Sequence, residues 1–283
     1  MEKIGLLIDS TTLTRKEISD YEFIKTVYLK VIIDQKEYSE KELTKEDMEK
    51  YLAGSHKMLT SQPSPQNFLD LYHEFKNEGY THVLVVVLAE KISGTYQSAM
   101  IAKTMFEEST MELSIHSPHT ASFGIANGIS VIAEKIKAKT AFSEVLDLYY
   151  KLFREPLVTF TISDLIHLLK GGRLNKVQAL IGTVLKIKPI IEMIDGKLGL
   201  VKKTRTINAC YDFFVEKIEY YTNKYSNVYI DIIDLHAEEW SQKLENYVKD
   251  NHPNAIIHRT NYVSPVFFVH LGNKGFGIAI VAY

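Results

Sequence analysis

The sequence contains a single cysteine, Cys210, among 283 residues. One cysteine excludes a disulfide within the chain and any zinc site built from several cysteines. Neither sign of charge is in excess, because the chain has 33 Lys and Arg residues and 35 Asp and Glu residues. This balance gives no overall sign of nucleic-acid binding. We therefore expect neither a metal site nor a nucleic-acid partner.

Long hydrophobic runs and common catalytic motifs are absent as well. The first segment, "MEKIGLLIDS", has a short apolar run that ends at Asp9, too short for a signal peptide or a membrane span, so we predict a cytoplasmic protein. The chain has no P-loop and no H-E-x-x-H pattern, and "GNKGFG" has the wrong spacing for a dinucleotide fingerprint. No cofactor is expected.

Alternating strand and helix patterns run through the first half of the chain. Apolar strand-like runs occur at 3–9, 27–33, 81–88 and 111–116. Helical spacing occurs between and after them, at 44–53, 65–78, 95–106 and 121–137. The run "THVLVVVLA" is apolar at nearly every position, which is typical of a strand covered on both faces. The sequence predicts an α/β domain with a parallel sheet.

A second series of elements follows Glu155–Pro156. We predict strands at 157–161, 188–194, 197–203, 227–233, 254–260 and 275–282. We predict helices at 163–170, 175–185, 207–222 and 237–250. The "DGK" between two of the strands predicts a hairpin. Two α/β domains, 1–156 and 157–283, fit this organisation best.

Residues 60–66, "TSQPSPQ", place polar side chains in front of prolines. Ser64 is expected to cap a helix that Pro65 begins, because proline lacks an N–H that would have no partner there. This leaves Thr60, Ser61 and Gln62 unexplained, and polar side chains beside a proline-fixed backbone also suit a ligand.

Hydroxyl residues follow three predicted strands, in "DSTT", "KISGTYQSA" and "SPHT". Open α/β sheets bind ligands beyond the carboxyl ends of their strands. Ser93 and Gly94 precede a predicted helix, whose first N–H groups form a natural anion site. The alternative is that Ser93 or Thr95 only caps this helix. Both interpretations stay open.

His270 lies in "SPVFFVHLGNKGFG", where it is either a core residue or a ligand contact. Ser93, His270 and Asp9 would also suit a serine-dependent esterase, because triads are defined by geometry. Ser93 lacks the G-x-S-x-G elbow, however. Residues 170–205 contain nine Lys or Arg residues and only two acidic ones, Glu192 and Asp195. This excess of positive charge suits an acidic partner or a phosphate.

Seven motifs in order resemble the DegV family of bacterial fatty acid-binding proteins: "DSTT", "TSQPSP", "ISGTYQSA", "LKGGRL", "LKIKPI", "KTRT" and "HLGNKGFG". The resemblance implies a two-lobe DegV-like α/β fold with a lipid tunnel between and within the lobes. It implies one long-chain fatty acid as the ligand, and no catalytic residue of the protein's own.

The resemblance also implies roles for individual residues. Thr60 and Ser93 would donate to the fatty acid carboxylate, with His270 as a third donor and Ser61 and Gly94 beside them. Some relatives present the lipid to the ATP-binding subunit of a fatty acid kinase, and Arg173 in "GGRL" would contact that subunit. A lipid sensor without a kinase is the alternative, and a transient membrane contact is compatible with either.

The terminal motif departs from the family pattern G-P-V-x-G-x-H-x-G-P-G. Here Ser264 and Phe268 replace two glycines, and Asn273–Lys274 replaces the Pro-Gly pair. We expect Phe268 to shorten or reroute the lipid tunnel and Lys274 to add a cation near His270.

Overall fold

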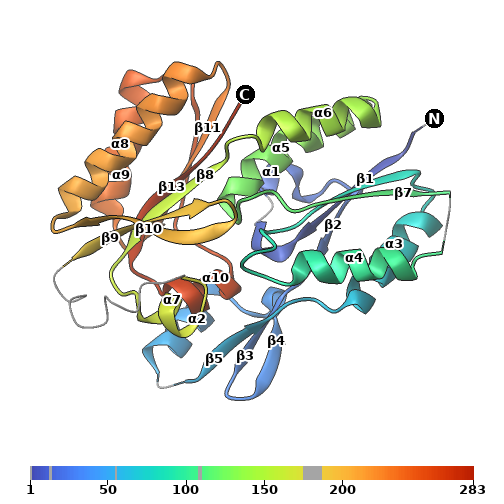
Figure 1. The fold of residues 1–283 in the computed structure, drawn as a ribbon, viewed down its shortest axis with the longest axis horizontal. Coiled ribbons are helices and arrows are strands. Elements are labelled where there is room, and N and C mark those ends of the chain that lie inside the picture. The colour runs from blue at the N-terminus through green and yellow to red at the C-terminus, as the bar shows by residue number, and fades with distance from the viewer. Residues whose placement is uncertain (1, 13–14, 55, 108–109, 175–186) are drawn as a thin grey trace.

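A computed structural model describes residues 2–12, 15–54, 56–107, 110–174 and 187–283 of the chain. The described strands form three sheets (Figure 1). The first sheet has the order β2-β1-β6-β7, and its neighbouring strands all run parallel. Its strands are β1 (Ile4–Asp9), β2 (Ile24–Val27), β6 (His82–Val86) and β7 (Glu112–His116). The predicted parallel sheet is confirmed.

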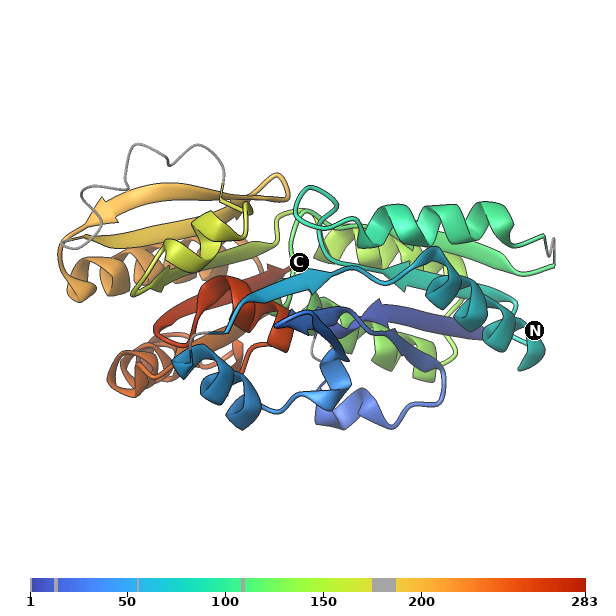
Figure 2. The ribbon, with the colours of Figure 1, turned by 90° about the horizontal axis from the view of Figure 1, so that it is seen from below.

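Helices cover both faces of this sheet (Figure 2). They are α3 (Pro65–Asn77) and α4 (Thr95–Met105) on one face, with α5 (Phe123–Lys137) and α6 (Phe142–Leu152) on the other. Because both faces are covered, β6 is apolar at almost every position, and Val83 and Leu84 on opposite faces are both fully buried. The predicted Ser64 cap is confirmed, because its side chain accepts a hydrogen bond from Asn67 N–H, and Thr44 likewise forms a capping box with Asp47 at the start of α2 (Lys45–Ala53).

A small antiparallel sheet, with the order β4-β3-β5, extends from the first one. Its strands are β3 (Lys30–Ile33), β4 (Lys36–Ser39) and β5 (Met58–Ser61), and α2 (Lys45–Ala53) lies between β4 and β5 in the chain. The single strand predicted at 27–33 is therefore wrong. Between β2 and β3 the Leu29 N–H donates to the Ser10 hydroxyl at 2.9 Å, so the chain leaves one sheet there and enters the other.

The second large sheet has the order β10-β9-β8-β13-β11-β12. Its strands are β8 (Leu157–Ile162), β9 (Lys188–Ile194), β10 (Lys197–Thr204), β11 (Val228–Leu235), β12 (Ile256–Thr260) and β13 (Gly275–Ala282). Only β11 and β12 pair in parallel. The β9–β10 hairpin turns through Asp195 and Gly196, both at positive φ, as "DGK" predicted.

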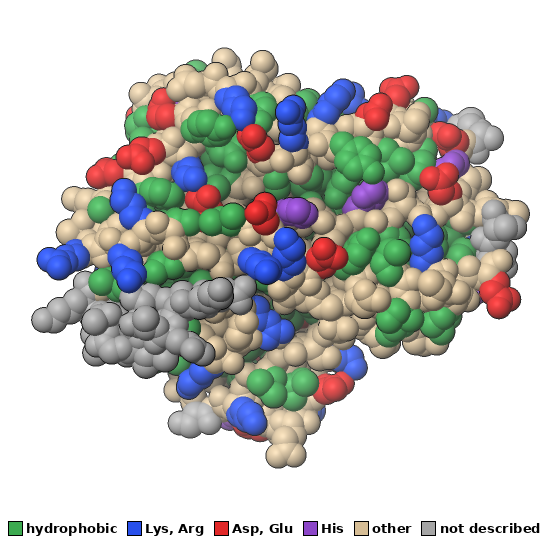
Figure 3. All heavy atoms as spheres, in the orientation of Figure 1, with side chains coloured by type: hydrophobic (Ala, Val, Ile, Leu, Met, Phe, Trp, Pro, Cys, Tyr) green, Lys and Arg blue, Asp and Glu red, His purple; other side chains and the backbone are tan. Residues whose placement is uncertain are grey.

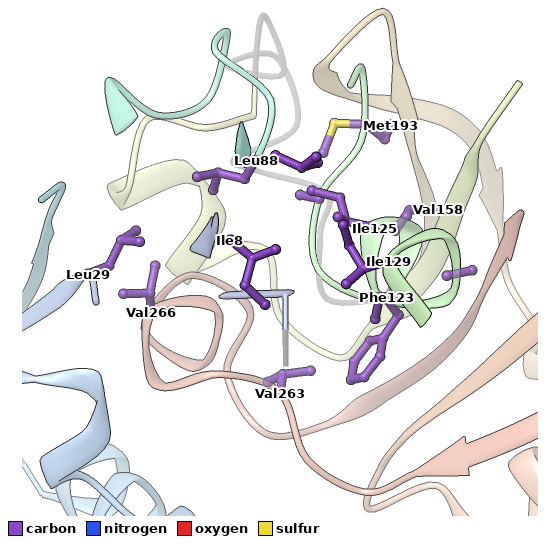
Figure 4. Packing of buried hydrophobic residues seen from close by; sticks show 14 of the residues in the cluster. Ile8, Leu29, Leu88, Phe123, Ile125, Ile129, Val158, Met193, Val263 and Val266 are labelled. Atoms are coloured by element: carbon purple, nitrogen blue, oxygen red, sulfur yellow. The ribbon is translucent and has the colours of Figure 1, made fainter. Parts of the chain in front are cut away.

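Helices α8 (Ile207–Lys224) and α9 (Glu238–Asn251) cover one face of this sheet. On the other face, Val158 and Ile233 join a core that also contains Ile8 and Ile129, so α5 packs between the two large sheets (Figure 4). An α/β fold with a parallel sheet and a second sheet domain is confirmed. The boundary at Glu155–Pro156 stays a prediction.

Three short helices complete the described fold: α1 (Lys16–Ser19), α7 (Ile166–Lys170) and α10 (Pro265–Leu271). The predicted helix 163–170 is shorter in the structure, because the Asp164 carboxylate accepts from Ile166 N–H and turns the chain before the helix begins. The helices α6 and α10 were not predicted. The helix predicted at 175–185 lies outside the described residues.

Candidate functional site

A cavity of about 290 Å³ opens where the small sheet, the turn before α4 and the helices α7 and α10 meet. Apolar residues form much of its wall: Leu29, Leu88, Ile92, Leu168, Leu198, Val266, Phe267 and Leu271. The polar residues gather in one group: Thr60, Ser61, Gln62, Ser93, Arg173 and His270. The structure thus brings together most of the site residues that the sequence suggested.

Gln62 explains how the "TSQP" and "ISGT" motifs are held against each other. Its Nε2 donates to Ser98 Oγ of α4 at 3.2 Å. A Cβ on Gly94 would lie only 2.1 Å from Gln62 Oε1, so a larger residue at position 94 would push the amide away. Gly94 is not among the residues that line the cavity, and its contribution is this close approach.

Ser93 lies in the turn that follows β6 and precedes α4. Its Oγ accepts a hydrogen bond from Thr95 N–H at 3.3 Å and lies 2.9 Å from Thr95 Oγ1. These contacts support the alternative that Ser93 helps to cap α4. With Thr95 as the donor, the Ser93 hydroxyl hydrogen remains available to a group in the cavity.

His270 contacts Thr60 directly, with 2.9 Å between His270 Nε2 and Thr60 Oγ1. Burial lowers the pKa of His270 to about 4, with Arg173 and His167 lowering it further, so the ring is neutral near pH 7. Its Nδ1 is buried and has no partner among the described residues. Since a buried N–H without an acceptor is costly, we assign the hydrogen to Nε2.

This tautomer changes the role expected for His270. The imidazole donates to Thr60 Oγ1, and the Thr60 hydroxyl then directs its own hydrogen elsewhere, into the cavity. His270 is thus better placed to orient Thr60 than to be an independent third donor to a ligand.

The glycines of "LKGGRL" make room for this histidine. A Cβ on Gly171 would lie 2.3 Å from His270 Nδ1. We expect Gly171→Ala to displace the ring, break the Thr60 contact and weaken binding of an anionic ligand by up to about tenfold. Gly199→Ala is the control, because a Cβ there meets its nearest atom at an ordinary 3.5 Å. Unchanged affinity in Gly171→Ala, measured by ligand titration, would show that His270 does not orient Thr60.

Arg173 carries the only charge among the described residues that line the cavity. Its Nε donates to the Ile92 carbonyl at 3.3 Å and its Nη1 to the Gly171 carbonyl at 2.5 Å. Neutral carbonyls leave the guanidinium charge uncompensated. Two backbone carbonyls thus hold this side chain at the cavity, and its place beside the hydroxyls gives the cavity an anion-binding character.

A second cavity, of about 50 Å³, continues from the first one and is almost wholly apolar. The two cavities share Leu198, Phe267 and Leu271. The second is walled by residues of α5 and of the six-stranded sheet, such as Phe123, Val158 and Met193, which Figure 4 shows around the core between the sheets. A polar, cationic compartment thus leads into a narrow apolar one.

The residues that depart from the family pattern in the terminal motif lie in α10 or next to it in the chain. Ser264 is buried and caps this helix, accepting from Phe267 N–H. Phe268 is buried in the core and does not line either cavity, so the expected obstruction of the tunnel by Phe268 is wrong; the neighbouring Phe267 lines both. Lys274 is exposed and lines a different hollow, with Trp240, so it adds no cation to the site around His270.

Asp9 and its "DSTT" motif are structural in this fold. The carboxylate is fully buried and accepts from Thr11 N–H at 2.9 Å and from Leu88 N–H at 2.7 Å, and burial raises its pKa to about 6. These bonds tie β1 to the end of β6. The esterase triad is not assembled, since His270 contacts Thr60 and its Nδ1 has no carboxylate partner among the described residues.

No group of three or more His, Cys, Asp or Glu residues among the described residues could hold a metal ion. No described helix is both long and apolar enough to cross a membrane.

Comparisons with known proteins agree with this geometry. The family model described as "Uncharacterised protein, DegV family" matches residues 3–283. A DegV domain-containing protein of Listeria monocytogenes is 30% identical over 285 residues, covering 98% of each chain. A fatty acid binding DegV family protein of Streptococcus agalactiae has a TM-score of 0.89 at 25% identity, over 100% of both chains. DegV of Bacillus subtilis, a fatty acid binding protein, has a TM-score of 0.88 at 24% identity, again over 100% of both chains, and shows the same fold.

Proposed function

The chain belongs to the DegV family, and we propose that it binds one long-chain fatty acid, with the carboxylate in the polar cavity and the tail directed into the apolar one, which has to widen because its volume of about 50 Å³ is smaller than a whole long acyl chain. Thr60 and Ser93 would donate to the carboxylate, and Arg173 would supply the opposite charge. The observation that carries this proposal is the junction at Leu198, Phe267 and Leu271 between a cationic, hydroxyl-lined cavity and an apolar one. A fatty acid has the same division of chemistry.

The energetics of the two compartments support the same ligand. A carboxylate that leaves water needs partners, and hydrogen bonds to a charged group contribute about 1.5–3 kcal/mol each. Each buried methylene contributes about 0.8 kcal/mol, so a chain of ~16 carbons gains on the order of 12 kcal/mol before the entropic costs of association. The tail therefore supplies most of the affinity, and the polar cavity fixes the orientation. The fatty acid binding relative of Streptococcus agalactiae supports the proposal at 25% identity.

Protein purified from a bacterial host is expected to carry close to one fatty acid per chain. The narrow apolar cavity would release such a ligand slowly, since its surface is removed from water. Mass spectrometry of an organic extract, calibrated against protein concentration, measures this stoichiometry. An extract without fatty acid, together with no binding of added fatty acid by the folded protein, would overturn the proposed function.

We further propose that the protein presents the carboxylate to a separate kinase subunit for acyl phosphate formation. Two features favour a partner at this end of the lipid. Gln62 at the polar cavity is exposed, and so are Lys197, Lys202 and Lys203 of the β9–β10 hairpin. Figure 3 shows basic side chains along the part of the surface that this hairpin occupies in Figure 1. Such a surface suits an acidic partner.

A lipid sensor without a kinase is the competing role. Acyl phosphate formation from ATP, with a cognate kinase subunit added, separates the two roles. The cytoplasmic location, on which this partnership depends, stays a prediction.

A further inference from the structure

Two polar side chains of the apolar cavity, those of Ser122 and Thr161, have no hydrogen-bond partner among the described residues. Ser122, at the residue before α5, lines this cavity and is only 9% exposed. Its hydroxyl oxygen is buried and makes no hydrogen bond to the described residues. A buried hydroxyl left without a partner costs about 1–3 kcal/mol, so its presence in a lipid cavity needs an explanation.

The backbone of Ser122 is also unusual. Its φ of 54° and ψ of −124° lie outside the regions that residues with a side chain readily adopt. Glycine would relieve this conformation at no steric cost. A serine that keeps both a strained backbone and an unpaired hydroxyl is therefore not there for stability, and such residues gather at ligand sites.

The start of helix α5 adds one backbone donor at the same place. Ser122 is the N-cap of this helix of 15 residues, and its side chain makes no capping hydrogen bond. The N–H groups of Gly124, Ile125 and Ala126 donate to the Ala121 and Ser122 carbonyls, so in this first turn the Phe123 N–H is the group without a hydrogen bond among the described residues, and the start of the helix carries a partial positive charge. The surrounding wall is apolar at Val158, Ile233 and Leu235, and Thr161 is the other polar residue of the lining. This end of the cavity thus presents hydrogen-bond donors in an otherwise apolar surface.

We propose that the apolar cavity selects an acyl chain that carries an oxygen atom, as a hydroxyl or keto group, part-way along its length. This oxygen would accept a hydrogen bond from Ser122 and lie at the start of α5. The inference rests on the proposed function, because it concerns the tail of the same fatty acid. It adds a specificity determinant that the carboxylate site cannot supply.

The test compares a plain fatty acid with fatty acids that differ from it only in this oxygen. Delipidated protein is titrated with octadecanoic acid and with a positional series of hydroxy- and oxo-octadecanoic acids. At least one position is expected to bind about tenfold more tightly than the plain chain, because only that oxygen meets the donors. Ser122→Ala is expected to abolish this preference while plain octadecanoic acid still binds.

Ser122→Gly and Ser241→Ala complete the experiment. Ser122→Gly removes the hydroxyl and relieves the backbone, so it should also lose the preference while its melting temperature rises. Ser241 is another fully buried serine without a partner among the described residues, but it lies on α9 away from the cavity; its alanine variant should keep the preference.

Three results would overturn the inference. The first is equal binding of all isomers by the unchanged protein, as expected if only a water molecule occupies the donors. The second is a preference that survives in Ser122→Ala. The third is no binding of any fatty acid, which would overturn the proposed function as well and is distinguished by the plain acid.

Discussion

Arg173→Ala is expected to lower fatty acid affinity by roughly ten- to a hundredfold, the loss of one hydrogen-bonded charge partner for a carboxylate. Arg173 is the only charged side chain among the described residues around the polar cavity, and its own hydrogen bonds go to neutral carbonyls. No neighbouring cation in that lining can replace it. Titration of delipidated protein with a long-chain fatty acid measures the effect.

Two further variants sharpen this result. Arg173→Lys should recover affinity only in part, since an ammonium group lacks the planar fork that binds both carboxylate oxygens. Lys170→Ala removes an exposed cation three residues away that does not line the cavity, and it should change affinity less than about threefold. If Arg173→Ala binds fatty acid normally, the guanidinium is not part of the carboxylate site.

The same variant tests the partner role predicted for Arg173. Acyl phosphate formation is measured at fatty acid concentrations that saturate each protein, so that weaker lipid binding no longer limits the rate. A defect that persists at saturation assigns Arg173 a contact with the kinase in addition to the carboxylate. A normal rate at saturation would confine Arg173 to the lipid and remove the partner role.

Much of the architecture followed from local patterns. The fully apolar run around Val83–Val86 could only be a strand with both faces covered, and β6 is that strand. Ser64–Pro65 marked the start of α3 through a cap and a proline. The same signal, Ser264–Pro265, also marks the start of α10, a helix that was not predicted.

The site itself was harder to predict, because its contacts join distant parts of the chain. A hydroxyl motif after a strand pointed to Ser93, and the polar residues in front of the prolines pointed to Thr60. Nothing local showed that Gln62 would lie against Gly94, or His270 against Gly171, since each pair meets only in the folded protein. The partner role of Arg173 was implied by the resemblance at "GGRL", and the local charge pattern reports the sign of a side chain's charge and not its direction. Ser122 also needed the structure, because neither strain nor a missing partner is visible in a sequence.

Asp231→Ala is expected to destabilise the folded protein strongly. Asp231 lies on β11, is buried, and accepts from Arg15 Nη2 at 2.7 Å and from Asn127 Nδ2 of α5 at 2.6 Å. Removing this carboxylate leaves the Asn127 amide N–H without its acceptor and the Arg15 guanidinium with only the neutral Asn127 Oδ1 in place of a counter-charge. The free energy of unfolding should fall by about 3–5 kcal/mol, and the melting temperature by on the order of 10 °C. Thermal and urea unfolding measure both.

Two control proteins distinguish the loss of this buried ion pair from the loss of an exposed one. Glu37→Ala breaks an exposed ion pair, in which Lys30 and Glu37 side chains are 43% and 54% exposed, and should cost less than about 1 kcal/mol. Replacing Arg15 by Met together with Asp231 by Leu should recover much of the loss, since no unpaired charge then stays buried. A small effect of Asp231→Ala would mean that Arg15 reaches water when its partner is removed.

The stability lost in Asp231→Ala should depend on pH, in a direction set by the pKa shift of Asp231. Burial raises the pKa of Asp231 from 3.8 to about 6, although Arg15 and Asn127 act to lower it. Between these values the native protein holds a proton that the unfolded chain has lost, so the stability contributed by Asp231 rises as the pH falls from about 6 toward 4, and it is lost as the pH rises through about 6 and levels off above that value. The gap in unfolding free energy between the unchanged protein and Asp231→Ala should therefore widen on going from pH 7 to pH 5, by up to about 1.4 kcal/mol per unit. A gap that narrows instead would show that the ion pair with Arg15 outweighs burial, and that Asp231 stays ionised throughout this range.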